Sequence, residues 1–200
     1  MGPSAAPDLT VFILAGGKST RMGVDKAFIK LNGQTLLARS LDLARSVAAD
    51  VRVAGSPEKF AEFAPAVGDI FPDRGPLGGI HAALRASRTD LNLMLAVDMP
   101  VLPVAFLEYL IDQARSAPKA TAVVPRDNGR SQPLCAIYRR NFVATAETAL
   151  LAGRNRIDSL YSEIEVRVIE KEEWMRKGFS SAIFRNLNTP EELELEKQRT

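Results

Sequence analysis

The chain has 200 residues, 46% of them apolar and 25% charged, and a formal net charge of +2. This composition is typical of a globular protein and excludes a collagen-like, disordered or coiled-coil chain. At about 150 residues per domain, the length predicts one domain over residues 1–200, of which we expect 1–8 to be disordered. The small net charge gives no argument for nucleic-acid binding. No apolar run approaches the ~20 residues of a membrane helix.

The chain contains a single cysteine, Cys135, and a single histidine, His81. One cysteine excludes an internal disulfide and a thiolate zinc cluster. The first seven residues lack the basic and apolar stretches of a signal peptide, so we expect a cytoplasmic protein. One histidine excludes Ser-His-Asp hydrolases and two-histidine zinc proteases. Any chemistry must rely on carboxylates, Lys, Arg, backbone amides and hard metal ions.

Short apolar runs alternate with amphipathic stretches along the chain. The runs predict strands at 10–15, 51–54, 66–71, 91–97, 121–124, 134–138 and 165–169. The amphipathic stretches predict helices at 35–48, 57–63, 79–86, 103–114 and 141–151, and a last helix that begins after Thr189. This alternation predicts an α/β protein with a mainly parallel sheet, helices on both faces and a ligand at the carboxyl ends of the strands. The strand at 134–138 follows a short hairpin, which favours an antiparallel direction.

A glycine-rich segment follows the first predicted strand. Gly16 and Gly17 let a ligand approach the backbone closely, and backbone amides in such a loop bind phosphate. Arg21 and Lys26 add charges suited to a triphosphate. A P-loop needs glycine where Phe12 stands, and adjacent glycines do not fit G-x-G-x-x-G. A surface loop with scattered cations is the alternative.

Two carboxylates follow predicted strands. Asp98 ends the central apolar strand, where it can hold Mg²⁺, which takes one or two carboxylates plus phosphate oxygens. The alternative for Asp98 is a helix cap before Pro103. Asp73 can contact a ligand or form a turn.

Polar residues of the last quarter form a second group of candidates. Arg156 lies in a charged stretch, and Asn186 and Asn188 flank Leu187, so that strand alternation would put both amides on one face. They can bind a polar ligand, and a charged loop and a strand-end cap are the alternatives. His81 is more typical of a surface or packed residue than of a catalyst.

Residues 14–26 read L-A-G-G-K-S-T-R-M-G-V-D-K, an order that resembles the nucleotidyltransferases of sugar nucleotides and cofactors. Within that group the chain is similar to the molybdenum cofactor guanylyltransferases. Four further segments carry this resemblance along nearly the whole chain, at 73–80, 98–100, 132–136 and 184–193. One departure is Ala54-Gly55-Ser56, where the family often has an asparagine after the second strand. That nucleotide contact then falls to Gly55 or Ser56.

The resemblance implies a Rossmann-like nucleotidyltransferase fold and transfer of GMP from GTP to molybdopterin, with Mg²⁺ as cofactor and pyrophosphate as product. It implies that Arg21, Lys26 and Asp98 are catalytic, with Asp98 as the metal ligand. It also implies nucleotide binding by Leu14, Ala15, Gly16, Gly17, Lys26, Asp73 and Asp98, and pterin binding by Arg156, Asn186 and Asn188. An ionised phosphate nucleophile needs no general base, which agrees with a chain containing one histidine.

Three alternatives remain open. They are a CTP-using transferase acting on the same pterin, a sugar-1-phosphate nucleotidyltransferase, and a nucleotide-binding regulator without turnover. GTP-using relatives read L-A-G-G and CTP-using ones L-A-A-G, so Gly16 favours GTP. We expect no nucleic-acid or membrane partner, and transient contacts with proteins that deliver or accept the cofactor are compatible with this interpretation.

Overall fold

The computed structural model describes residues 6–16, 25–187 and 192, and every structural statement below concerns these residues. The strands are β1 (Ala6–Leu14), β2 (Lys30–Leu31), β3 (Gln34–Thr35), β4 (Ala48–Ala54), β5 (Ala66–Val67), β6 (Leu91–Ala96), β7 (Ala122–Asp127), β8 (Arg130–Ser131), β9 (Cys135–Arg139) and β10 (Val166–Ile169). The helices are α1 (Leu36–Arg45), α2 (Pro57–Phe60), α3 (Pro76–Ala86), α4 (Val104–Ser116), α5 (Phe142–Leu151) and α6 (Lys171–Met175), with 3-10 turns η2 (Lys26–Phe28), η3 (Ile157–Leu160) and η4 (Ser181–Phe184).

The central sheet has eight strands, in the order β10-β7-β9-β6-β1-β4-β5, with β8 paired to β7. Along that order β9 is antiparallel to β6 and β7, and the remaining pairs are parallel. The α/β class and the mainly parallel sheet are therefore confirmed, and the strand after the hairpin does run antiparallel.

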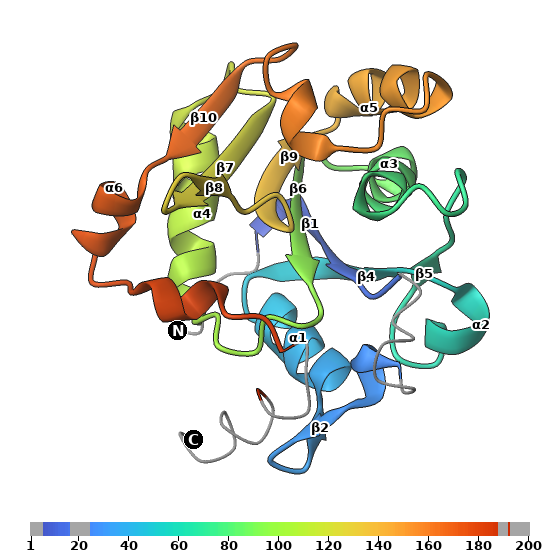
Figure 1. Cartoon of the computed structure of the whole chain (residues 1–200). Helices are drawn as coiled ribbons and strands as arrows, with labels where there is room; N and C mark the ends of the chain where they lie inside the picture. Colours follow the sequence, from blue (N-terminus) through green and yellow to red (C-terminus); the bar gives the residue numbers. More distant parts are fainter. Residues whose placement is uncertain (1–5, 17–24, 188–191, 193–200) are drawn as a thin grey trace.

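Side chains of β1 alternate between two apolar layers, which explains how helices cover both faces of the sheet (Figure 1). Val11 and Ile13 pack in the layer that contains α1 and α4, whereas Phe12 packs in the layer that contains α3 and α5. All three side chains are fully buried. β6 is buried at every position, as expected for a central strand with helices on both sides.

Parallel pairing brings the carboxyl ends of three strands to one edge of the sheet. Leu14 at the end of β1 pairs with Ala54 at the end of β4 and with Ala96 at the end of β6. The residues that follow each strand therefore emerge side by side. This is the edge at which open α/β sheets bind ligands.

Several boundaries differ from the sequence prediction. β1 begins at Ala6, because Ala6 pairs with Ala48, so the last three residues of the segment expected to be disordered belong to a strand. Ala48 begins β4 instead of ending the helix. The predicted helix at 79–86 starts at Pro76. The last predicted helix lies, apart from Glu192, outside the described residues.

A small hairpin, β2–β3, was not predicted. Its turn is Asn32-Gly33, and both residues have positive φ, 51° and 82°. Asn-Gly is the preferred pair for such turns, but strands of two residues show no alternation. None of the described helices has the length and apolar character needed to cross a membrane.

Candidate active site

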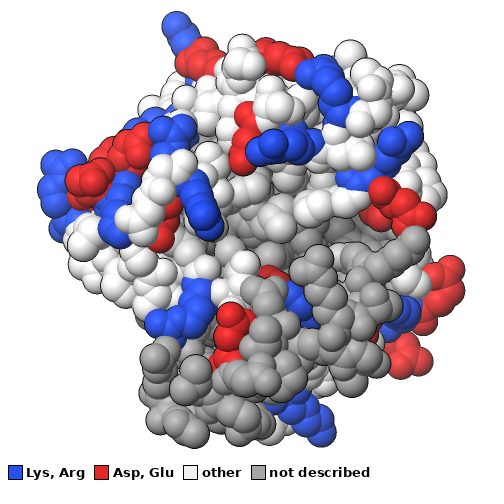
Figure 2. All heavy atoms as spheres, in the orientation of Figure 1, with Lys and Arg blue, Asp and Glu red and all other residues white. Residues whose placement is uncertain are grey.

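A cavity of about 510 Å³ lies at the carboxyl ends of β1, β4 and β6. The face of the molecule drawn in Figure 2 is hollowed near its centre. The described lining residues are Leu14, Ala15, Gly16, Asp25, Lys26, Ala54, Asp69, Asp73, Gly75, Pro76, Gly79, Ala96, Val97, Asp98 and Leu134. Its wall thus combines small apolar groups with four carboxylates and one ammonium group.

Lys26 and Asp98 meet in this cavity. The Lys26 Nζ atom lies 2.9 Å from Asp98 Oδ2, and the two side chains are 20% and 17% exposed. Asp98 directly follows the buried run of β6 and Val97, and Lys26 begins η2. Asp98 does not cap α4, because Pro103 occupies that position. Two opposite charges held at the wall of an open cavity are suited to exchange partners with an ionic ligand.

Backbone hydrogen bonds hold the end of β1 against β4. The amides of Ala15 and Gly16 both donate to the carbonyl of Ala54, over 3.0 and 3.1 Å. Leu14, Ala15 and Gly16, for which the resemblance predicts nucleotide binding, line the cavity. Gly17 and Arg21, expected in the same loop, lie outside the described residues.

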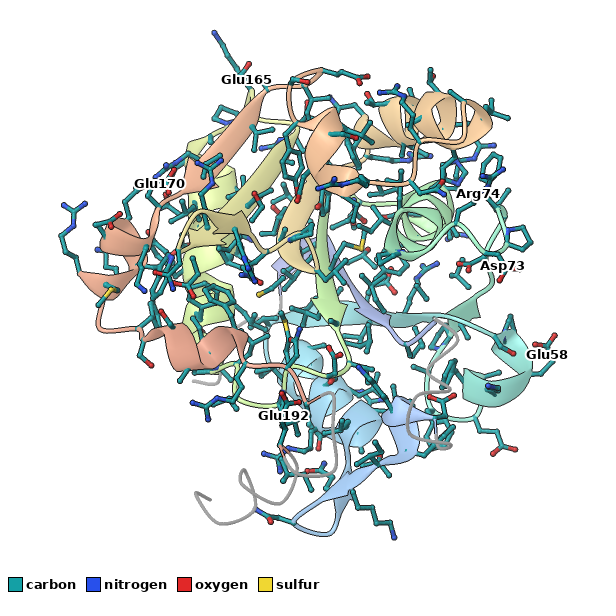
Figure 3. The ribbon with its side chains drawn as sticks, in the orientation of Figure 1. Glu58, Asp73, Arg74, Glu165, Glu170 and Glu192 are labelled. Atoms are coloured by element: carbon teal, nitrogen blue, oxygen red, sulfur yellow. The ribbon has the colours of Figure 1, made fainter. Side chains whose placement is uncertain are left out.

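The opposite wall comes from the segment between β5 and α3. Asp73 has a φ of 59° and lies beside Arg74 on the turn that leads into α3 (Figure 3). Asp69 also lines the cavity, although the sequence analysis placed it inside a predicted strand. The surrounding protein partly desolvates its carboxyl group, and this together with the charge of Asp73 raises the pKa of Asp69 above its usual value. The signal that was missed is an acidic residue two positions after the end of a short edge strand.

A smaller cavity of about 250 Å³ adjoins the first one. It shares Ala15, Gly16, Asp25 and Asp69 with the main cavity, and adds Gly55, Ser56, Lys59, Phe60 and Gly68. The Ser56 hydroxyl donates to Glu58, and the Gly55 amide donates to the carbonyl of Val67. Gly55 and Ser56 therefore do reach the cavity, but the Gly55 amide and the Ser56 hydroxyl already donate to protein partners.

The C-terminal candidates take different positions. Arg156 is exposed, precedes η3 and is not among the residues that line the main cavity. Asn186 is partly buried, and within the described part of the chain its buried Oδ1 atom has no hydrogen-bond partner. The next residue, Leu187, donates its amide to the backbone carbonyl of Asp98 over 2.9 Å. Residues 185–187 form no strand, so strand alternation does not apply to Asn186, which lines neither cavity although its neighbour Leu187 contacts Asp98. Asn188 lies outside the described residues.

His81 is packed, in agreement with the sequence interpretation. Its side chain is 1% exposed, and its ring meets the Phe71 ring edge-on at 5.1 Å between centroids. Burial lowers the pKa of His81. It lines neither cavity.

Among the described residues, no three His, Cys, Asp or Glu side chains gather closely enough to hold a metal ion by protein ligands alone. Asp98 nevertheless presents carboxylate oxygens to the cavity, and Asp25 lies in the same wall. A cation that shares its coordination between one or two carboxylates and a phosphate ligand fits this donor set.

A cavity at the carboxyl ends of parallel strands, with a glycine-bearing edge and a charged Lys–Asp pair, is suited to bind an anionic ligand. The family model described as "MobA-like NTP transferase domain" matches residues 11–168, and the chain belongs to this family. It is 31% identical over 188 residues to the "Probable molybdenum cofactor guanylyltransferase" of Carboxydothermus hydrogenoformans, covering 94% of each chain. It is 35% identical over 189 residues to the "Molybdenum cofactor guanylyltransferase" of Desulfosudis oleivorans, covering 93% of each chain.

Comparison with solved structures agrees with this family assignment. The crystal structure of "Molybdopterin-guanine dinucleotide biosynthesis protein A" from Archaeoglobus fulgidus superposes with a TM-score of 0.82 at 26% identity, covering 95% of this chain and 97% of that one. The resemblance to guanylyltransferases and the nucleotidyltransferase fold are therefore confirmed, and the protein is a nucleotidyltransferase.

Proposed function

We propose that this enzyme transfers GMP from GTP to the phosphate of molybdenum-bearing molybdopterin, releasing pyrophosphate, in the cytoplasm. The observation that carries the proposal is the Lys26–Asp98 pair, which faces the cavity beside the end of β1. The names of the curated relatives support the choice of substrates.

In the proposed reaction the pterin phosphate oxygen forms a bond to the α-phosphorus of GTP, and the bond from that phosphorus to the β-phosphate oxygen breaks. The electron pair leaves with pyrophosphate, and no proton has to move. The protein contributes mainly orientation and positive charge. Lys26, supported by Arg21, neutralises the charge that develops on the leaving group.

Nucleotidyltransferases of this family generally use a divalent metal. Asp98 would hold Mg²⁺ through a carboxylate oxygen, with phosphate oxygens as further ligands. The ion, when bound, supplies positive charge to those phosphate oxygens. The Lys26 ammonium, which pairs with Asp98 over 2.9 Å, would contribute positive charge to the same phosphates.

The base is assigned to the cavity wall that carries Asp69 and Asp73. Guanine presents two neighbouring N–H donor groups, and one carboxylate can accept hydrogen bonds from both. Asp69 lies at the junction of the two cavities, where it can make this contact, with Asp73 next to it. Gly16, which also lines both cavities, leaves room for a purine because it carries no side chain.

The pterin is assigned to the side where the C-terminal segment reaches Asp98. The Oδ1 atom of Asn186, which has no hydrogen-bond partner among the described residues, supports this assignment, because a buried acceptor without a partner is costly unless a ligand satisfies it. Arg156 supplies an exposed cation for the pterin phosphate, and Asn188 a further amide.

A panel of GTP, CTP, ATP and UTP, each with Mg²⁺, tests the nucleotide by its effect on the melting temperature, because a ligand that binds the folded state raises apparent stability. We expect the largest shift with GTP. A larger shift with CTP would identify the enzyme as the cytidylyltransferase. Pyrophosphate release with GTP and the pterin, but not with sugar 1-phosphates, then establishes the acceptor, and binding without release would indicate a regulator.

A further inference from the structure

The short helix α2 packs against Gly55, which lies beside one described end of the segment 17–24, and contacts the other end directly. The first end is Gly16, at the close of β1. Gly55 separates Gly16 from Phe60 of α2, and a Cβ atom on Gly55 would lie 2.7 Å from Phe60 Cε2 and 3.4 Å from the Gly16 nitrogen. Contacts below 3.0 Å do not occur for real Cβ atoms. Glycine at position 55 is therefore what allows the Phe60 ring to pack this close to the end of β1.

The second end is the stretch from Asp25 to Phe28, which contains Lys26. Lys59 of α2 places its Nζ atom 3.3 Å from Asp25 Oδ2. The Phe28 ring stacks on the Phe60 ring, with 5.9 Å between centroids and 26° between planes. Contacts to α2 therefore flank Lys26 in the sequence on both sides.

The η2 turn itself is well fixed around Lys26. The Asp25 side chain accepts a hydrogen bond from the Ala27 amide over 3.1 Å, and Ala27 is fully buried. A shift of α2 would therefore move η2 as a unit, and the Lys26 ammonium with it. Because Phe60 stacks on Phe28 and packs against Gly55, which lies beside Gly16, α2 connects the end of β1 to the stretch that carries Lys26.

We infer that α2 positions Lys26 for the triphosphate of the nucleotide, with Lys59 and Phe60 as positioning residues that act through Asp25 and Phe28. This rests on the proposed function, in which Lys26 binds phosphate. Displacements of about 1 Å are enough to lower the efficiency of an oriented site strongly. Loosening α2 should therefore weaken binding of the β- and γ-phosphates and leave binding of the nucleoside and its α-phosphate unchanged.

The test compares calorimetric titrations of GTP and GMP, with Mg²⁺, into wild type and Lys59→Met. An exposed ion pair contributes about 0.2–1 kcal/mol, so we expect GTP binding to weaken by about 1.5- to 5-fold. GMP binding should stay unchanged, and Lys59→Arg should restore GTP binding. Lys30→Met is the matched control, because it removes the same charge from an exposed lysine that lines neither cavity.

A second variant, Phe28→Ala, removes the ring that stacks on Phe60. A paired aromatic contact contributes about 0.5–1.5 kcal/mol, so we expect about a 2- to 12-fold loss of GTP binding, again without loss for GMP. Phe28 is 37% exposed, so the fold should survive, which a cooperative melting transition within a few degrees of wild type would verify.

Equal losses for GTP and GMP would overturn the inference, since they would place Lys59 or Phe28 against the nucleoside. Unchanged GTP binding in both variants would overturn it as well. If wild type binds CTP in preference to GTP, the proposed base specificity fails, and the same comparison is made with CTP and CMP. Binding of no nucleoside triphosphate by wild type would contradict both proposals.

Discussion

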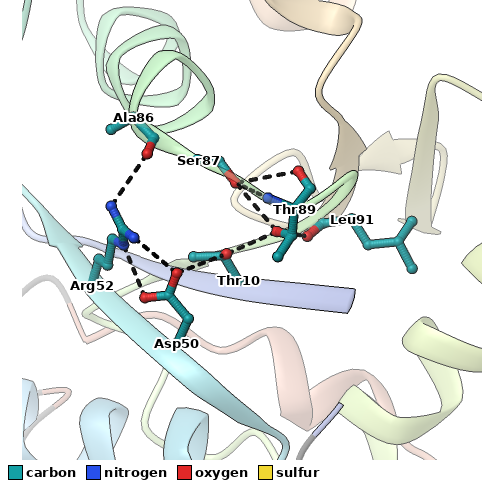
Figure 4. A network of polar contacts seen from close by, with 7 residues as sticks. All are labelled: Thr10, Asp50, Arg52, Ala86, Ser87, Thr89 and Leu91. Atoms are coloured by element: carbon teal, nitrogen blue, oxygen red, sulfur yellow. Dashed lines mark hydrogen bonds and ion pairs between the residues drawn. The ribbon is translucent and has the colours of Figure 1, made fainter. Parts of the chain in front are cut away.

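Near the amino ends of β1, β4 and β6 the polar side chains form a closed network, whereas at the carboxyl ends of the same strands they line an open cavity. Figure 4 shows the network. Thr10 bonds to Asp50 and to Thr89, and Arg52 donates to both Asp50 oxygens over 2.9 Å and to the carbonyl of Ala86. Ser87 completes the network by bonding to Thr89.

The carboxylates at the two ends respond oppositely to their surroundings. Hydrogen bonds from Arg52 hold the pKa of Asp50 below its usual value, whereas desolvation and the charge of Asp73 raise the pKa of Asp69. The surroundings of Asp50 therefore stabilise its ionised form, whereas the surroundings of Asp69 disfavour the ionised form. Polar groups near the amino ends therefore stabilise the fold, whereas the proposed function assigns those at the carboxyl ends to ligand binding, with a cost in stability at Asp69.

The largest expected effect concerns Asp98. Asp98→Asn keeps the size of the side chain but removes the charge that would hold Mg²⁺, so we expect transfer to fall by about 10³-fold with the fold intact. Pyrophosphate release measures the loss, and the melting temperature checks the fold. Asp112→Asn, an exposed aspartate on α4, is the control. Near-normal turnover of Asp98→Asn would return Asp98 to a structural role.

The second-largest loss of activity is expected for substitutions of Lys26 and Arg21. Removal of one preorganised charge-stabilising group slows a reaction by about 10²–10³-fold, and we expect Lys26→Ala and Arg21→Ala each to fall in this range. Single-turnover kinetics with saturating GTP would separate this loss from weaker binding. Changes below about threefold in both variants would show that these residues do not hold the triphosphate.

Arg156→Ala tests whether the nucleotide and the pterin bind to different parts of the site, because it should affect binding of the pterin only. A charge-assisted hydrogen bond to phosphate contributes about 1.5–3 kcal/mol, or roughly 10- to 150-fold in binding. We expect pterin affinity to fall by that order and GTP affinity to stay nearly unchanged, with a smaller effect for Asn188→Ala because a neutral hydrogen bond contributes about 0.5–1.5 kcal/mol. Calorimetric titration of each ligand decides the assignment. Loss of GTP binding instead would assign the C-terminal segment to the nucleotide.

The central elements could be predicted from the sequence because local pattern and burial agree there. β6 is apolar at nearly every position and is the buried central strand, and Asp98 stands just beyond its end. The edge of the sheet could not be predicted equally well. β5 has only two residues. The apolar residues on both sides of Asp69 favoured a single longer strand over 66–71, so Asp69 was placed inside a strand and not recognised as a cavity residue. The contact between Leu187 and Asp98 joins distant parts of the chain, which no local pattern records.

Asp69→Asn tests the ligand-binding end of the comparison. Loss of the charged acceptor should weaken GTP binding by roughly 10- to 100-fold. The folded protein should not be destabilised near neutral pH, because a carboxyl whose pKa is raised on folding opposes stability once the pH exceeds that pKa. Calorimetry with GTP and thermal melting at pH 7 measure the two effects. A marked drop in melting temperature would assign Asp69 to the structural network instead.

Asp50→Asn is the matched change at the amino end, and its expected effect is the smallest. The variant loses a charge-assisted pair with Arg52, which should lower the free energy of unfolding by about 0.5–1.5 kcal/mol, toward the lower value because the carboxylate is partly exposed. Transfer should be unchanged, since Asp50 lines neither cavity.

The stabilisation by Asp50 should depend on pH, because the pKa of Asp50 is lowered on folding. Its stabilising contribution is present above the ordinary aspartate pKa of about 3.9 and disappears as the pH falls through the lower pKa of the folded state. Wild type and Asp50→Asn should therefore differ in unfolding free energy at pH 7 and converge in acid, as measured by urea titration at a series of pH values. A constant difference at every pH would mean that the side-chain geometry and not the charge of Asp50 stabilises the network.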